Sequence, residues 1–170
     1  VGTSVLTATV DGSGVAVTNT TQLISGTLAV RAGYVGDGNF APASATGASL
    51  VVSCAPVYTV DTTADAGAGT LRQALLDVCT GGTITFAPAL TASGPATITL
   101  TGTQLNVTKN LTVTGPGASL LLVSGNNAHR VFNINAGVTA AISGLAIGDG
   151  RLTSGAGGGI QNAGNLTLAS

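Results

Sequence analysis

The stretch Leu105-Asn106-Val107-Thr108-Lys109-Asn110-Leu111-Thr112-Val113 decides the fold, because its pattern recurs twice downstream. The recurrences are Phe132-Asn133-Ile134 followed by Gly137-Val138, and Ile160-Gln161-Asn162 followed by Asn165-Leu166-Thr167-Leu168. In each copy the first apolar residue and the second strand are separated by the same interval, at 105 and 111, 132 and 138, and 160 and 166. The step from one copy to the next is therefore nearly constant as well. Short strands repeated in this way, with Gly or Asn at the corners, predict a parallel β-solenoid of about three coils, open at its C-terminal end.

One amphipathic helix is predicted upstream of this repeat, from Thr70 to Cys79. Thr70 suits the N-cap, and Gln73 completes a Thr-x-x-Gln capping box. Gly81 or Gly82 is expected to end the helix in the left-handed conformation. The spacing i, i+3, i+4, i+7 gathers one apolar stripe, formed by Leu71, Ala74, Leu75 and Val78. Because a lone amphipathic helix in a β chain must bury its stripe, we expect it to cap one end of the solenoid.

Residues 1–54 have the pattern of separate β structure. Strands are predicted at 5–10, 15–17, 28–34 and 49–53, separated by clusters of Gly, Asp, Ser and Asn. Pro56 cannot donate to a β ladder and therefore favours a boundary at this point. The expected organisation is a β domain over 1–54 and a helix-capped solenoid over 55–170.

The composition excludes several classes of function. The 170 residues include five Lys or Arg and six Asp, a net charge of −1, and only 6% of the chain is charged against about a quarter in an ordinary domain. The basic residues are scattered and cannot neutralise a run of phosphates, so no nucleic-acid partner is expected. The longest aliphatic run, Leu120 to Val123, predicts no transmembrane helix. Thr, Ser and Asn must supply the solubility, a composition that favours an extracellular location.

The two cysteines, Cys54 and Cys79, are expected to form a disulfide, since an exported protein with an even count favours pairing. Two buried free thiols, or a metal or redox role, are the alternatives. A zinc site lacks ligands, because the chain has one His and no Cys-x-x-Cys. No metal and no cofactor are expected.

No catalytic residue is expected either. His129 could face Asp149 across one coil, but a solvated loop His is the simpler interpretation. Glycoside hydrolysis takes two carboxylates, and lyase chemistry takes clustered acids and a base. The predicted solenoid offers one acid, Asp149. A carbohydrate-active β-helix enzyme, or a glycan-binding module, with its site outside this chain is therefore the alternative function, and scarce aromatic side chains argue against sugar binding.

Two resemblances add to these patterns. Residues 26–34 and 36–42, with Gly36-Asp37-Gly38-Asn39-Phe40-Ala41-Pro42, resemble the C-terminal half of bacterial immunoglobulin-like repeats. Residues 65–75, followed by Thr83-Ile84-Thr85-Phe86, resemble the capped start of right-handed β-helix proteins on bacterial surfaces. Gly157-Gly158-Gly159-Ile160 is similar to the repeats of polymorphic outer-membrane proteins and autotransporters. These resemblances imply an incomplete immunoglobulin-like β-sandwich followed by a right-handed parallel β-helix.

The resulting fold class is all-β with one short α-helix, and the expected function is structural or adhesive without catalysis. Two forms of this function are open. The chain is either a surface-filament subunit joined head to tail by β-strand complementation, or a scaffold segment of a large adhesin. The expected partners are other copies, neighbouring domains or surface glycans. The residues expected to matter are structural: Cys54 and Cys79 for the staple, and Thr70, Leu71, Gln73, Leu75 and Val78 for the cap.

Overall fold

A computed structural model describes residues 26–36, 38–39, 41–52, 54–152, 155 and 157–170. The chain divides into two compact units, Val1–Ser53 and Cys54–Ser170, and each is described by itself.

The described part of the first unit is a two-stranded antiparallel sheet. Strand β1 (Gly26–Tyr34) pairs with β2 (Ala43–Val52), and the register shifts between Ala29 and Arg31. The predicted strand over 28–34 is confirmed, and the one over 49–53 begins earlier than expected. The predicted strands over 5–10 and 15–17 lie outside the described residues. The immunoglobulin-like sandwich stays a prediction.

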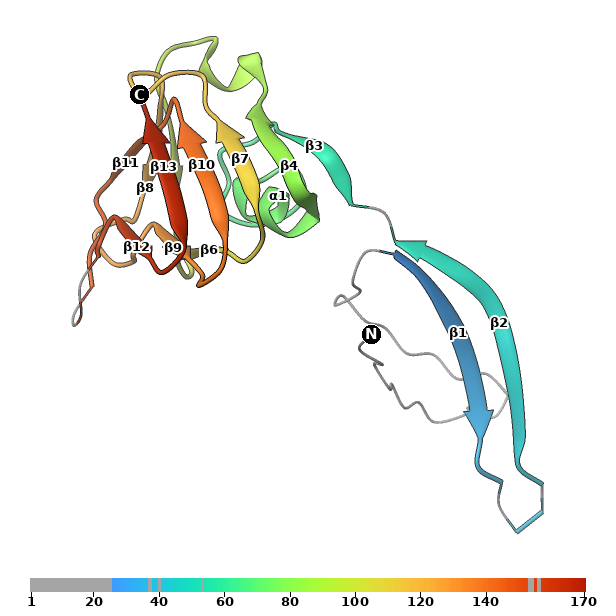
Figure 1. Cartoon of the computed structure of the whole chain (residues 1–170). Helices are drawn as coiled ribbons and strands as arrows, with labels where there is room; N and C mark the ends of the chain where they lie inside the picture. Colours follow the sequence, from blue (N-terminus) through green and yellow to red (C-terminus); the bar gives the residue numbers. More distant parts are fainter. Residues whose placement is uncertain (1–25, 37, 40, 53, 153–154, 156) are drawn as a thin grey trace. The chain divides into compact units, whose positions relative to one another are not determined.

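The second unit is a parallel β-solenoid with three sheets (Figure 1). The largest sheet has the order β13-β10-β7-β4-β3 and contains β3 (Ala55–Val60), β4 (Val78–Phe86), β7 (Leu111–Thr114), β10 (Thr139–Ser143) and β13 (Asn165–Ala169). The second contains β5 (Ala96–Thr99), β8 (Leu121–Ser124) and β11 (Ala146–Gly148). The third contains β6 (Leu105–Val107), β9 (Phe132–Ile134) and β12 (Ile160–Asn162).

The strand order defines the coils. Among the described residues, three coils contribute one strand to every sheet: β4-β5-β6, β7-β8-β9 and β10-β11-β12. Strands β3 and β13 extend the largest sheet at its two edges. Helix α1 (Leu71–Asp77) lies between β3 and β4, and a short 3-10 helix, Pro88–Thr91, follows β4. The prediction of an all-β solenoid with one α-helix is confirmed.

One half of the predicted repeat register is correct and the other half is shifted. Leu105 pairs with Phe132, and Phe132 with Ile160, as the nearly constant step of the repeat requires. Leu111, however, pairs with Ala140 and not with Val138. A turn precedes β10 in this coil, in which Val138 N–H donates to the carbonyl oxygen of residue 135 at 3.2 Å, and the strand starts after it. A shift by an even number of positions keeps the side-chain parity, so Val138 is still buried.

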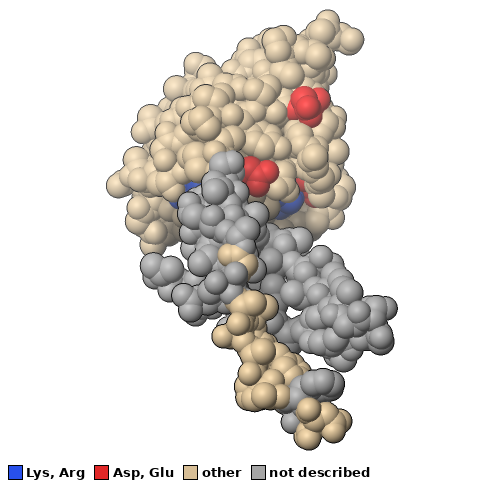
Figure 2. Space-filling model, turned by 90° about the vertical axis from the view of Figure 1, so that its right-hand side faces the viewer, with Lys and Arg blue, Asp and Glu red and all other residues tan. Residues whose placement is uncertain are grey.

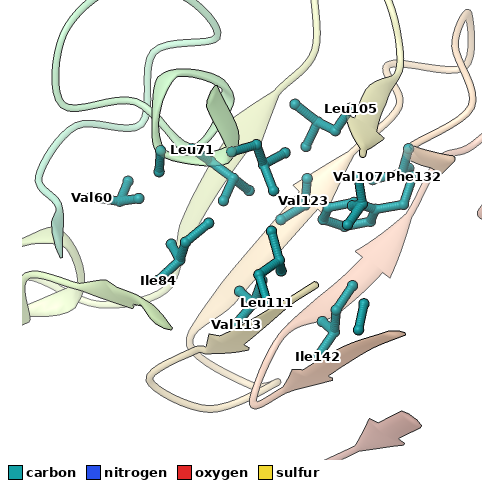
Figure 3. Close-up of a cluster of buried hydrophobic side chains, with 14 of the residues drawn as sticks. Val60, Leu71, Ile84, Leu105, Val107, Leu111, Val113, Val123, Phe132 and Ile142 are labelled. Carbon is teal, nitrogen blue, oxygen red and sulfur yellow. The ribbon is translucent and has the colours of Figure 1, made fainter. Parts of the chain in front are cut away.

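The core consists of side chains from all three sheets. Strand β6 has the pattern buried–exposed–buried, and β7 and β9 likewise alternate between buried and more accessible positions. Helix α1 adds Leu71 to the same cluster, so the cap and the coils share one core. The side chains converge along one continuous cluster (Figure 3), which includes Ile84, Leu105, Val107, Leu111, Val113, Val123, Phe132 and Ile142.

Glycine is required where coils stack directly at a corner. Gly115 follows β7, and Gly144 follows β10 in the next coil with φ of +62°. Gly115 N–H donates to Ser143 O at 2.8 Å. A Cβ atom on Gly144 would lie 2.6 Å from Gly115 O, so no other residue fits this corner without moving the backbone. Glycine therefore permits close backbone packing between these coils.

Candidate functional site

The best-built polar site of the second unit is the cap at its N-terminal end. Thr70 is the N-cap of α1: its hydroxyl accepts from Gln73 N–H at 3.1 Å and donates to Gly67 O at 2.8 Å. Helix α1, which carries most of the cap residues predicted from the sequence, lies beside β3 and β4 (Figure 1). Helix α1 packs against β3, β4 and β6. The residues of its apolar stripe are buried, as predicted: Leu71, Ala74, Leu75 and Val78.

Two details of the predicted helix are wrong. The helix ends at Asp77 and not at Cys79, because Val78 is already extended and belongs to β4. Gly81 has a φ of +82° but lies within β4, so it does not terminate the helix. The capping box is half formed, because the Gln73 side chain donates to Asp77 Oδ2 at 2.9 Å instead of reaching back to the N-cap.

An ion pair that was not predicted from the sequence ties the cap to the first coil. Asp65 Oδ1 accepts from Arg72 Nη2 at 2.6 Å and from Arg72 Nε at 3.1 Å. Arg72 also donates to the carbonyl oxygens of Thr103 and Gln104, at 2.6 and 3.0 Å. Asp65 Oδ2 accepts from Thr101 N–H at 3.0 Å. The pair therefore joins the loop before α1, the helix itself and the corner between β5 and β6.

The surroundings of Asp65 lower the pKa of its carboxyl group. Burial alone raises this pKa, since only 8% of the side chain is exposed, but the hydrogen bonds from Arg72 and Thr101 and the Arg72 charge together outweigh burial. The pKa of Asp65 lies below its ordinary value of 3.8 as a result. The ionised carboxylate of Asp65 is therefore the form that accepts the hydrogen bonds from Arg72 and Thr101.

Asp65 should consequently make the stability of the protein depend on acid pH. Because its pKa is lower in the folded than in the unfolded chain, its stabilising contribution is complete above pH of about 4 and is lost as the pH falls through the folded pKa. We expect Asp65→Asn to remove this part of the acid dependence and to lower the free energy of unfolding by about 2 kcal/mol at pH 7. Urea unfolding between pH 2 and 7 measures the free energy of unfolding and its dependence on pH. Asp77→Asn, on the exposed end of α1, is the matched control, and equal acid profiles for the two variants would contradict the assignment.

The C-terminal end of α1 is held by Lys109 from the next coil. Its Nζ atom donates to the carbonyl oxygens of Leu76 and Val78, at 2.8 and 2.9 Å. Helix C-terminal carbonyl groups lack intrahelical partners and carry partial negative charge, so an ammonium group satisfies them well. Lys109 lies inside the stretch that predicts the repeat, but its long separation from the helix along the chain hides this contact from sequence reasoning.

A disulfide joins Cys54 to Cys79, with the two Cα atoms 4.9 Å apart. The pairing predicted from the sequence is confirmed, and the alternatives of two free thiols or of a metal site at these cysteines are excluded. Cys54 is the first residue of the second unit, and Cys79 is the second residue of β4. The bond therefore closes a covalent loop around β3 and α1, which are the elements of the cap.

The outward faces of the sheets carry uncharged polar rows. On the largest sheet, Thr59 Oγ1 is 3.2 Å from Thr85 Oγ1. On the third sheet, Asn106 lies beside Asn133, and the Asn133 amide donates to Asn106 Oδ1 at 3.3 Å. Figure 2 shows one face of the molecule with few charged side chains on it. Hydrogen bonding between such neighbours, in place of charge, gives the solenoid its polar exterior.

Asp149, one of the two residues weighed as catalytic, is hydrogen-bonded within a corner of the solenoid. Asp149 Oδ2 accepts from Ser124 Oγ at 2.7 Å, across adjacent coils, whereas His129 contributes its backbone, whose N–H donates to Gly125 O at 2.9 Å. Ser124 is buried and also accepts from Asn126 N–H at 3.1 Å. This arrangement closes a corner where Asn126 and Asp149 have positive φ angles. Within the described residues, no group of three His, Cys, Asp or Glu side chains lies close enough to hold a metal ion.

The opposite end of the solenoid is apolar. A hollow of about 430 Å³ lies on the last coil, lined chiefly by Ile142, Leu145, Ile147, Ile160 and Leu168. Leu168 of β13 is 56% exposed. The two ends of the described solenoid thus differ: α1 covers the core at one end, and hydrophobic side chains reach solvent at the other.

Comparison with models of protein families, with curated proteins and with solved structures finds no match to this chain. The resemblances to immunoglobulin-like repeats and to right-handed β-helices of autotransporter type therefore stay predictions. Among the helices of the described residues, none is long and apolar enough to cross a membrane.

Proposed function

We propose that this chain is a structural module of an extracellular surface protein and that it works as a rigid scaffold without catalysing a reaction. The observation that carries this proposal is the hydrophobic core, which is continuous from α1 through the stacked coils of the described residues. A core of this kind supports a rod to which coils are added in one direction. The disulfide supports the extracellular location, because such bonds persist in oxidising compartments.

Of the two structural forms, the scaffold of a large adhesin is favoured over the head-to-tail filament. A head-to-tail contact needs two different complementary ends, and strand complementation needs an acceptor groove and a donor strand. Among the described residues, apolar side chains around β13 are accessible to such a contact. The other end buries its core under Leu71 and Leu75 of α1, which leaves no matching apolar cross-section for stacking among the described residues. The uncharged Thr and Asn rows suit an adhesive exterior.

Exposed leucines at the two ends allow a matched test of the acceptor end. We expect the isolated chain to associate reversibly as its concentration rises, because contact at the β13 end removes apolar surface from water. Leu168→Asp should weaken this association at least tenfold, while Leu76→Asp, at a residue on α1 that is 64% exposed, should leave it unchanged. Sedimentation velocity over a hundredfold range of protein concentration measures the association of the wild-type chain and of the two variants.

Electron microscopy and mass measurement of the same samples then separate the two forms. Short, bounded assemblies that Leu168→Asp dissolves support the scaffold form. Long filaments with this chain as the repeating unit would overturn the scaffold form in favour of the filament subunit. A chain that stays monomeric at all concentrations, with the same behaviour in both variants, would contradict the role of the apolar end.

A further inference from the structure

The position of the disulfide has a mechanical consequence. The chain passes from the first unit into the second at Cys54, and this same residue is bonded to Cys79. Strand β3, the loop after it and α1 all lie between the two cysteines, whose separation along the chain is 25 residues. Two routes therefore lead from Cys54 to Cys79: one through the backbone of the cap, and one through the two side chains and their disulfide bond.

The two routes differ greatly in how far they can lengthen under tension. The backbone route holds only while β3 stays paired with β4 and α1 stays buried, and each hydrogen bond involved contributes little net free energy because water can replace it. The sulfur route has almost no length to release, because it joins Cα atoms only 4.9 Å apart. It leads directly into β4, which is paired on both sides, with β3 and with β7. Tension arriving from the N-terminal side must follow the short covalent route, because the longer one is slack.

We propose that the Cys54–Cys79 disulfide is a mechanical bypass, which carries tension from the N-terminal unit into β4 and keeps the cap out of the force path. Without the bond, tension enters at Ala55 and pulls β3 away from β4, where the two strands are paired from Ala55 to Val60. Loss of β3 exposes Val60 and the α1 residues packed beside it, so the core of the first coil opens next. The proposal goes beyond the scaffold function and does not depend on any association between chains.

Single-molecule force spectroscopy on the full chain tests the bypass. One handle is attached at the N-terminus and the other at Ser119, an exposed residue in the corner between β7 and β8. This geometry places the cap and β4 in the loaded segment and leaves the apolar β13 end unloaded. We compare the oxidised protein with the double variant Cys54→Ser/Cys79→Ser, under the same force ramp.

In the double variant we expect an additional extension of roughly 80 Å, the length of 25 extended residues less the original Cα separation. It should precede the rupture of β4 from β7 and occur at a lower force. The oxidised protein should lack this early step. Since the double variant loses stability even without load, reduction of the folded wild-type protein while it is held at constant force provides a second measurement, in which the same extension should follow reduction.

Two outcomes would overturn the proposal. One is a double variant that releases the cap length only together with the rupture of β4 from β7, which would mean that the cap withstands the load without the bond and needs no bypass. The other is a folded wild-type protein whose reduction under constant force gives no cap-sized extension before that rupture. The reduced wild-type protein decides between misfolding of the variant and loss of the bypass, because it has folded with the bond in place.

Discussion

Phe132→Ala should lower the free energy of unfolding by about 3–5 kcal/mol, the largest loss that we expect from a single substitution in this chain. Phe132 is the largest fully buried side chain of the described residues. It belongs to β9, in the middle of the row Leu105–Phe132–Ile160. Removal of the ring leaves a cavity between two coils, and neither neighbour can move to fill it, because the parallel hydrogen bonds of the third sheet hold both in register.

Urea unfolding followed by far-UV circular dichroism measures this loss. Leu76→Ala is the control for loss of a large apolar side chain, because Leu76 is 64% exposed on the outer face of α1, and we expect it to cost less than about 0.5 kcal/mol. The loss of unfolding free energy for Phe132→Leu should lie between the losses for Phe132→Ala and Leu76→Ala. A loss below about 1 kcal/mol for Phe132→Ala would show that the solenoid can collapse into the cavity, and that the coils are not held in the register described.

The same row shows how much of the fold is predictable from the sequence. Leu105, Phe132 and Ile160 recur with nearly constant steps, and a parallel sheet converts constant steps directly into neighbouring strands. The cap is predictable for a similar reason. The helical stripe is local in sequence, and a β chain offers few surfaces that can bury it, so Leu71 and Leu75 can be assigned to the end of the solenoid in advance.

The features of the fold that could not be predicted lie in the corners between strands, where the sequence does not repeat at a constant interval. The longer turn before β10 makes Ala140, and not Val138, the partner of Leu111. A solenoid tolerates an insertion between strands when it has an even number of residues, because the same side chains of the strand then still face the core. The Asp65–Arg72 pair escapes prediction because its other partners lie in a corner that is distant along the chain. The only signal for it is a pair of opposite charges close together in a chain with so few charges.

Loss of the Cys54–Cys79 disulfide is the second large effect that we expect. The bond closes a loop of 25 residues, and the chain-entropy model gives a stabilisation of about 3.5 kcal/mol for a loop of this length. The double variant Cys54→Ser/Cys79→Ser should lose this amount of unfolding free energy. Its urea m-value should rise as well, because the unfolded chain is no longer held compact by the bond.

Reduction of the wild-type protein provides the control for the substitutions themselves. If the stabilisation arises in the unfolded chain, the reduced wild-type protein and the double variant should unfold at the same urea concentration, since both lack only the covalent loop. A large loss in the double variant with little loss on reduction would instead place the effect in the packing of the serine side chains near Ala55 and Val78. Equal losses accompanied by an unchanged m-value would contradict the entropic origin and indicate that the bond acts mainly by holding β3 on β4 in the folded protein.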